Sequence, residues 1–403
     1  MLPTPGNNNI MKQKLLNFFQ RHINALFALL RFFFPTLSFN NLVIVSRYSD
    51  VEEILNRPNV FGVTYAEKMG IITDGSNFFL GMNDTPLYER DVSNMRILMP
   101  RADVATVIKP SLESYADQRV ANLGDEFDMV SDLSARVPVY FCGHYMGVPG
   151  PDEQRMIDWA TYMFWYLFFP DVTTEQSDQA IAYAAETRQY LDALIQNRKQ
   201  SGDTHNDVIA RALELQKTGT PGMTDIDIRN NLIGMIIGAI PTTSKCAVLV
   251  LDYLLDHPEQ LALARQLVRD NQDDRLASLV LEALRFNVFG AGIFRIALQD
   301  YKLSSRRFRC RKIKQGSRVL ALTQSAMFDG RVVTHPRRFS LDRPRHIYMP
   351  FGAGMHTCFG YHINLVQIPA ILKPLLRKSH VERLPGATST GPFPAHFPIG
   401  TRD

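Results

Sequence analysis

Three features of the sequence predict a mainly α-helical protein with small β-sheets. Residues 226–255 are apolar on nearly every side of a helical projection, which is typical of a long buried helix. Residues 103–200 also show a mostly helical pattern, without an internal repeat or a low-complexity linker. The strand signals are short by comparison, and they lie at residues 41–46, 301–303, 308–313 and 319–322.

The elements between these segments are predicted from local signals. The strand at residues 41–46 precedes a helix that Asp50 caps and that ends before Pro58. Residues 61–80 are rich in glycine and polar residues and predict a long loop, whereas residues 83–99 predict a helix. The densest aromatic run of the chain, residues 161–170, lies in the following helical region.

Composition excludes several classes of function. The 403 residues can bury a large core, and 45% hydrophobic with 21% charged residues is ordinary for a soluble globular protein. A formal net charge of +4 is small for this length and argues against a nucleic-acid-binding protein. The four cysteines are far apart and predict neither a zinc site nor a disulfide framework, which fits a reducing cytoplasm.

The N-terminal segment is apolar without being a membrane span. Residues 11–34 are interrupted by basic side chains, so no run reaches the roughly 18 apolar residues that a span requires. We expect an amphipathic helix that covers the core or contacts a membrane face without crossing it. No cleavage pattern of small residues follows, so a signal peptide is not expected. We assign residues 1–38 to this extension and residues 39–403 to one domain.

The run from Phe351 to Gly360 carries the main functional signal. It places Cys358 in a glycine-rich loop before a mostly apolar segment, residues 362–376, which could form a helix that Pro369 and Pro374 bend or shorten. A thiolate is a strong metal ligand, and backbone N–H groups at a helix N-terminus favour it. The glycines permit positive φ angles and close approach to a flat ligand. The alternative is a buried structural cysteine in a glycine-rich turn.

Every defining position of this run resembles the haem-binding loop of cytochromes P450. The resemblance extends over about residues 40–400 and implies the cytochrome P450 fold, with residues 39–403 as a single catalytic domain. It implies haem b, iron protoporphyrin IX, as the cofactor and Cys358 as the ligand of its iron. By the same resemblance the haem contacts are Phe351, Gly352, His356 and Gly360.

A second resemblance lies in the long helix, at residues 238–243. It is similar to the oxygen-binding segment of the family, which implies catalytic roles for Thr242 and Thr243, a haem contact for Ala239 and a substrate contact for Ile240. Pro241 stands where the family has an acid, and it removes one backbone N–H from the helix. Two hypotheses follow: protons pass through Thr242 and a water at a helix kink, or the protein uses peroxide and needs no relay.

The supporting motifs occur in the family order. Glu282 and Arg285 are three residues apart, so their side chains meet on one helical face. By the resemblance they form a buried ion pair, which Arg338 joins. The resemblance also implies that Arg295 binds a haem propionate, and that Ile293 and Phe294 border the substrate. Bacterial family members carry a histidine and an arginine in the helix at 83–99; this chain has Tyr88 and Val92 there, and Arg96 is the substitute that we propose.

We therefore expect a monooxygenase that hydroxylates or otherwise oxidises an apolar small molecule held beneath the aromatic residues at 161–170. Electrons would come from a separate ferredoxin or flavodoxin with its reductase, which would dock on basic residues such as Lys312, Lys314, Arg345 and His346. A peroxide-driven peroxygenase, or an enzyme that rearranges hydroperoxides, is the first alternative. A haem-based sensor is the alternative that is not an enzyme.

Overall fold

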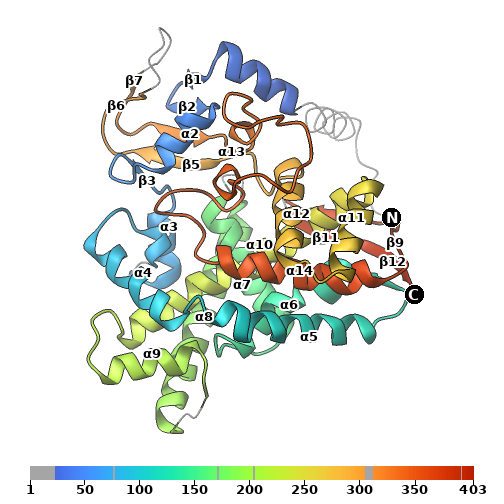
Figure 1. Cartoon of the computed structure of the whole chain (residues 1–403). Helices are drawn as coiled ribbons and strands as arrows, with labels where there is room; N and C mark the ends of the chain where they lie inside the picture. Colours follow the sequence, from blue (N-terminus) through green and yellow to red (C-terminus); the bar gives the residue numbers. More distant parts are fainter. Residues whose placement is uncertain (1–22, 76–77, 170–171, 203–204, 305–311, 392) are drawn as a thin grey trace, which may run out of the picture. The chain divides into compact units, whose positions relative to one another are not determined.

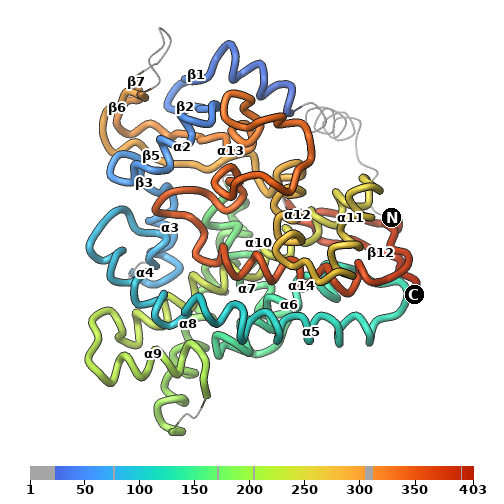
Figure 2. Tube along the Cα trace, in the orientation of Figure 1, coloured from blue at the N-terminus to red at the C-terminus, as the bar shows by residue number. Residues whose placement is uncertain are grey.

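The structure is a computed structural model that describes residues 23–75, 78–169, 172–202, 205–304, 312–391 and 393–403. The chain divides into two compact units. Unit 1 contains the described residues within 1–62, 290–339 and 343–355, and unit 2 contains those within 63–289, 340–342 and 356–403. Each unit combines segments that are far apart in the sequence, as the colours of the trace in Figure 2 show.

Unit 1 is built around a five-stranded sheet with the order β1-β2-β8-β5-β3. The strands β2 and β8 pair in parallel, and the other neighbours are antiparallel. Figure 1 shows blue N-terminal strands and orange strands from near residue 300 in this sheet. Its elements are helix 23–33, β1 (Thr36–Phe39), β2 (Leu42–Val45), α2 (Tyr48–Leu55), β3 (Phe61–Gly62), β5 (Ile293–Ala297), β6 (Tyr301–Lys302), β7 (Lys312–Ile313), β8 (Arg318–Ala321), α13 (Thr323–Ala326) and the 3-10 helix η4 (Arg345–Ile347).

Unit 2 is mostly helical and contains two small sheets, β4-β12-β9 and β10-β11. Its helices are α3 (Ala66–Thr73), η1 (Phe79–Gly81), α4 (Pro86–Leu98), η2 (Val104–Ile108), α5 (Lys109–Ala121), η3 (Met129–Ser134), α6 (Arg136–His144), α7 (Glu153–Phe168), α8 (Thr174–Gln200), α9 (Val208–Lys217), α10 (Asp225–Leu255), α11 (Pro258–Arg269), α12 (Asp273–Phe286) and α14 (Tyr361–Arg377). Its strands are β4 (Glu126–Asp128), β9 (His380–Arg383), β10 (Thr388–Thr390), β11 (Phe393–His396) and β12 (Pro398–Arg402).

The long helix α10 is the core element of unit 2 and confirms the predicted helix at 226–255 within one residue. A capping box between Thr224 and Asp227 starts it, because each residue satisfies a backbone N–H of the other. Pro241 lies inside the helix without ending it. Within the described chain, α10 alone is long and apolar enough to cross a membrane, and 78% of its most apolar window is buried in the protein.

Two local predictions were wrong. The segment 61–80 is not one long loop, because Met69, Ile72 and Thr73 are buried at helical spacing and form the inner face of α3. Helix α2 begins at Tyr48 rather than at a cap on Asp50, since the Tyr48 backbone N–H donates to Asp329 Oδ2 at 3.1 Å. A carboxylate from a distant segment therefore supplies the interaction that we had expected from a local residue.

The helix after the cysteine loop is longer than its two prolines suggested. Helix α14 runs for 17 residues, and both Pro369 and Pro374 lie within it. Its inner face is buried from Ile368 to Leu372, so packing offsets the backbone hydrogen bonds that the prolines remove. The predicted strands at 41–46, 301–303 and 319–322 are found within two residues. The strand at 308–313 is seen only as β7, because residues 305–311 lie outside the described chain.

Candidate functional site

Cys358 lies immediately before the first turn of α14. The Tyr361 backbone N–H donates to the Cys358 carbonyl at 3.1 Å, and the Asn364 N–H donates to the Gly360 carbonyl at 2.8 Å. Burial raises the pKa of the Cys358 thiol to about 11, while a hydrogen bond from the Gly360 backbone opposes that shift. The sulfur is thus a thiol that loses its proton when a cation takes the proton's place.

The glycines of this loop serve two different purposes. Gly352 and Gly354 have φ angles of 75° and 73°, in the region that only glycine adopts without strain. A Cβ on Gly354 would also lie 2.1 Å from the carbonyl oxygen of Leu55. Gly360, by contrast, has a φ of −77°, so the expected positive angle is wrong for this residue. A Cβ there would lie 3.3 Å from Asn364 Nδ2 and 3.8 Å from the Cys358 sulfur, so space is its requirement.

Two aromatic contacts of unit 2 hold the end of the cysteine loop. His356 Nε2 lies 2.8 Å from the carbonyl oxygen of Met82, to which it donates, and its ring centroid is 5.7 Å from that of Tyr88. Phe359 packs edge-on against Phe79 at 5.3 Å. Burial raises the pKa of Tyr88. Tyr88 stands where bacterial family members carry a histidine, and it reaches the cysteine loop through its ring contact with His356. Sequence reasoning noted this replacement but not its contact with His356.

Arg96 is exposed on α4, where its charge lowers the pKa of Tyr88 against the larger effect of burial. On β5 in unit 1, Arg295 is 4% exposed, and its Nη1 donates to the Phe294 carbonyl at 2.9 Å. Ile293 and Phe294 are half-buried on the same strand, and Arg318 lies over the Phe294 ring at 4.8 Å. Phe351 is also half-buried. These are the positions of the remaining predicted cofactor and substrate residues of both units.

The buried helix α10 is accessible at a few positions in its middle. Gly238 is exposed, and Ala239 and Thr242 are half-buried, although nearly all of their neighbours are buried. Ile240 is fully buried in the core. The Thr242 hydroxyl donates to the Gly238 carbonyl, one turn earlier. Pro241 cannot donate, so the Ile237 carbonyl lacks its usual helical partner.

Thr243 is buried, in contrast to the neighbouring Thr242, and connects α10 to α14. Its hydroxyl is 2.8 Å from Asn364 Oδ1, to which it donates, and both residues are buried. Asn364 Nδ2 in turn donates to the Gly360 carbonyl at 3.1 Å. A chain of hydrogen bonds therefore joins α10 to the residue two positions after Cys358. Sequence reasoning missed Asn364, although a polar residue on the apolar face of a buried helix is a detectable signal.

The predicted pair on α12 is present as a buried ion pair. Arg285 Nε and Nη2 donate to Glu282 Oε2 and Oε1 at 2.9 and 2.8 Å, and both side chains are 0% exposed. The Ser340 backbone N–H adds a 3.0 Å hydrogen bond to Glu282 Oε1. The third predicted member, Arg338, is described within unit 1, where its N–H donates to the His335 carbonyl at 2.9 Å.

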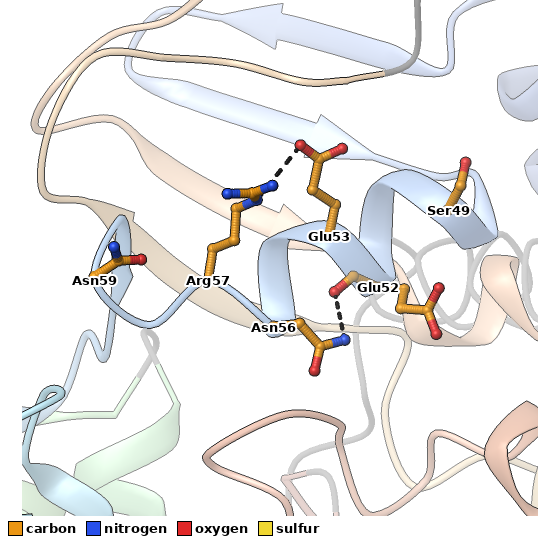
Figure 3. Close-up of a pocket in the computed structure, with 6 residues that line it drawn as sticks. All are labelled: Ser49, Glu52, Glu53, Asn56, Arg57 and Asn59. Atoms are coloured by element: carbon orange, nitrogen blue, oxygen red, sulfur yellow. Dashed lines mark hydrogen bonds and ion pairs between the residues drawn. The ribbon is translucent and has the colours of Figure 1, made fainter.

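A pocket of about 510 Å³ on the surface of α2 is not part of this site (Figure 3). Its lining is polar, and its acid Glu53 already accepts from Tyr301 Oη at 2.6 Å and faces Arg57 at 3.7 Å. None of the predicted functional residues lines it; its lining residues are Ser49, Glu52, Glu53, Asn56, Arg57 and Asn59.

The residues around Cys358 fit a metal that brings most of its own ligands. Across the described residues, no group of three His, Cys, Asp or Glu side chains is close enough to hold a metal ion. All ten residues of the loop 351–360 are partly accessible, with the sulfur beside a backbone N–H. Haem needs one axial protein ligand and a close backbone surface, which this loop supplies.

The comparisons with known proteins agree with this geometry. The sequence model of the family "Cytochrome P450" matches residues 12–393. Nocardicin C N-oxygenase from Nocardia uniformis subsp. tsuyamanensis is 26% identical, over 83% of this chain and 81% of that protein. Mycinamicin IV hydroxylase/epoxidase from Micromonospora griseorubida is 26% identical, over 73% of this chain and 70% of that protein.

The fold is shared with solved structures. A crystal structure of P450BioI, in complex with an acyl carrier protein carrying hexadec-9Z-enoic acid, superimposes with a TM-score of 0.78. It is 20% identical and the match covers 95% of this chain and 100% of that one. The predicted fold, mainly α with small sheets, is confirmed. The chain belongs to the cytochrome P450 family, and it is a haem-dependent monooxygenase of that family.

Proposed function

We propose that this chain oxidises an apolar small molecule, with electrons from a separate ferredoxin or flavodoxin and its reductase. The observation that carries the proposal is the position of Cys358 three residues before α14, in a loop that hydrogen bonds through Gly360 and Asn364 join to the middle of the buried helix α10. When bound, haem supplies the iron at which an oxidant is activated. The chain supplies the sulfur ligand and a shaped backbone surface.

Each haem contact has a physical reason. The Cys358 thiol would release its proton to solvent on binding the iron, and the Gly360 N–H would then stabilise the negative sulfur. Gly352 and Gly360 let the backbone come close to a flat ring. We propose that Arg295 and His356 bind the propionates, because a buried guanidinium favours carboxylates, and His356 would donate through Nδ1 since its Nε2 is hydrogen-bonded to Met82. Arg96, exposed on α4, remains the propionate partner that we propose in place of the family's arginine, whereas Tyr88 packs against His356.

An aromatic cluster supports an apolar substrate. The Phe164 ring lies 4.5 Å from Phe168, 6.2 Å from Phe289 and 5.4 Å from Phe393. These rings join the end of α7 to the segment after α12 and to β11, all within unit 2. Phe168 remains 38% exposed, so part of the cluster is open to a ligand. Burial of an apolar molecule against such rings is favourable at roughly 25 cal/mol per Å².

A second candidate function is peroxide-driven oxidation, which the state of α10 favours. Pro241 replaces the acid of the usual proton relay, and the Thr242 hydroxyl already donates to Gly238. Peroxide brings the protons that its own O–O cleavage requires, so such an enzyme needs no acid at position 241. The related rearrangement of a substrate hydroperoxide has the same advantage.

One experiment separates the two candidates. The haem-loaded protein is given NADPH with a ferredoxin and reductase, or hydrogen peroxide alone, and product formed per NADPH oxidised is measured. Well-coupled turnover with the reductase, and none with peroxide, supports the monooxygenase and rejects the second candidate. Turnover only with peroxide rejects the redox partner.

The salt dependence of the reductase reaction tests docking of the redox partner through Lys314, Arg345 and His346. Lys312, the fourth predicted docking residue, forms an ion pair with Asp300 within this chain.

A further inference from the structure

Lys245 on α10 is a buried lysine that forms no ion pair with any residue that the structure describes. The residue is 7% exposed, and its Nζ donates to the Phe289 carbonyl at 2.8 Å. The ammonium lies 4.3 Å from the Phe289 ring centroid and 5.2 Å from that of Phe393. Among the described residues, no carboxylate lies within ion-pair distance of Nζ, whereas most buried cations in proteins have such a partner.

This charge persists at neutral pH although its surroundings oppose it. Burial lowers the pKa of Lys245 to about 8, so the amine is still mainly protonated at pH 7. An ammonium has three N–H donors, and the Phe289 carbonyl accepts from one of them. The two aromatic rings stabilise the cation through their faces but accept no conventional hydrogen bond. The described residues offer the ammonium no second acceptor, so a ligand would have to supply one, preferably an anionic group.

The position of Lys245 on α10 relates it to the accessible part of the helix. Gly238, Thr242 and Lys245 are separated by four and three residues, so they lie along one stripe. The first two are the accessible positions in the middle of this buried helix. Phe289, which accepts from Lys245, is itself half-buried and belongs to the aromatic cluster at the end of α7. The ammonium is thus among the rings that we propose bind the substrate.

We propose that Lys245 is an anion subsite that binds the carboxylate of an apolar carboxylic acid substrate. The inference rests on the proposed function and names the substrate class of that same site. The rings of Phe289, Phe393 and Phe164 contact the apolar body of the acid and keep water from the ion pair. Such a site discriminates against the matching alcohol or ester, because neither neutralises the buried ammonium.

The test uses haem-loaded protein and measures binding, not turnover. Octanoic, dodecanoic and hexadecanoic acids are titrated against their primary alcohols and methyl esters, with dissociation constants from the Soret shift and from equilibrium dialysis. We expect at least one acid to bind roughly tenfold or more tightly than its alcohol and its ester. Lys245→Met should abolish this preference and leave alcohol binding unchanged. Lys245→Arg should keep most of it.

The exposed Lys217 on α9, 71% accessible, provides the matched control, and Lys217→Met should bind like the wild type. If no acid binds more tightly than its alcohol and ester, or if Lys245→Met keeps the preference, the subsite is rejected. If Lys245→Met does not fold, Lys245→Gln and the wild-type comparison still decide. Failure of the proposed function looks different: the reduced carbon monoxide spectrum would lack the signature of thiolate-ligated haem.

Discussion

The hydrogen bond between Thr243 and Asn364 allows a quantitative test of how α10 supports the cysteine loop. Thr243→Val keeps the shape of the side chain but leaves Asn364 Oδ1 buried without its donor, at 2.8 Å from where the hydroxyl was. The cost is about 1–3 kcal/mol, the penalty of an unsatisfied buried acceptor. The shift in Tm is this loss of stability divided by the entropy of unfolding, which is about 2.1 cal/mol/K per residue. For the 403 residues of this chain, the expected fall in Tm is roughly 1–4 °C.

The double variant T243V/N364L is the sharper measurement. It removes both polar groups, so no buried acceptor is left unpaired at this contact, and the two single effects should not add. We expect a coupling of about 1 kcal/mol, seen as a double variant no less stable than Thr243→Val alone. Thermal unfolding of the haem-loaded proteins, followed by tryptophan fluorescence, gives the Tm values. Strictly additive losses would contradict the role assigned to this hydrogen bond.

A spectroscopic readout distinguishes positioning from mere stability. Asn364 Nδ2 also donates to the Gly360 carbonyl, so Asn364→Leu should raise the fraction of reduced carbon monoxide adduct that lacks thiolate ligation. The matched control is Ser244→Ala on α10, next to Thr243. It removes a buried 2.8 Å hydrogen bond to Ser134, far along the chain from the loop, and should lower Tm without changing the spectrum. Identical spectra for both variants would show that Asn364 acts only on stability.

Three further perturbations have expected outcomes. Glu282→Ala removes the carboxylate that pairs with the buried Arg285. We expect a loss of about 3–5 kcal/mol and a protein that purifies without haem, measured by the ratio of Soret to protein absorbance. Glu214→Ala, on an exposed pair, should change nothing. Gly354→Ala places a Cβ 2.1 Å from the Leu55 carbonyl oxygen, at a residue whose φ is 73°, and it should prevent haem incorporation. The control Gly70→Ala on α3 has open space around its Cβ and should be neutral or stabilising. Cys358→Ser should abolish the thiolate signature of the carbon monoxide spectrum, and an unchanged spectrum would refute the assignment of the iron ligand.

What the sequence could predict depends on whether the signal is local. The cysteine loop, the Glu282–Arg285 pair and α10 were predictable, because spacing along one segment determines each of them. The contact of Asn364 with Thr243 joins residues 121 positions apart, and no local pattern encodes it. The same holds for the His356 bond to Met82, 274 positions away. Helix α3 was missed for another reason: its short inner face was hidden by neighbouring glycines.

The two threonines of α10 bear directly on the choice between reductase and peroxide. Thr242 donates its hydroxyl proton to Gly238, and Thr243 donates its own to Asn364, so both donors are directed at protein acceptors. Pro241 adds no N–H and leaves the Ile237 carbonyl as another acceptor. Of these three residues only Thr242 is accessible, because Ile237 and Thr243 are buried, and its oxygen presents lone pairs rather than a proton to a bound molecule. A hydroperoxide, which carries its own O–H donor, complements such a surface directly, whereas dioxygen chemistry would require Thr242 first to break its bond to Gly238.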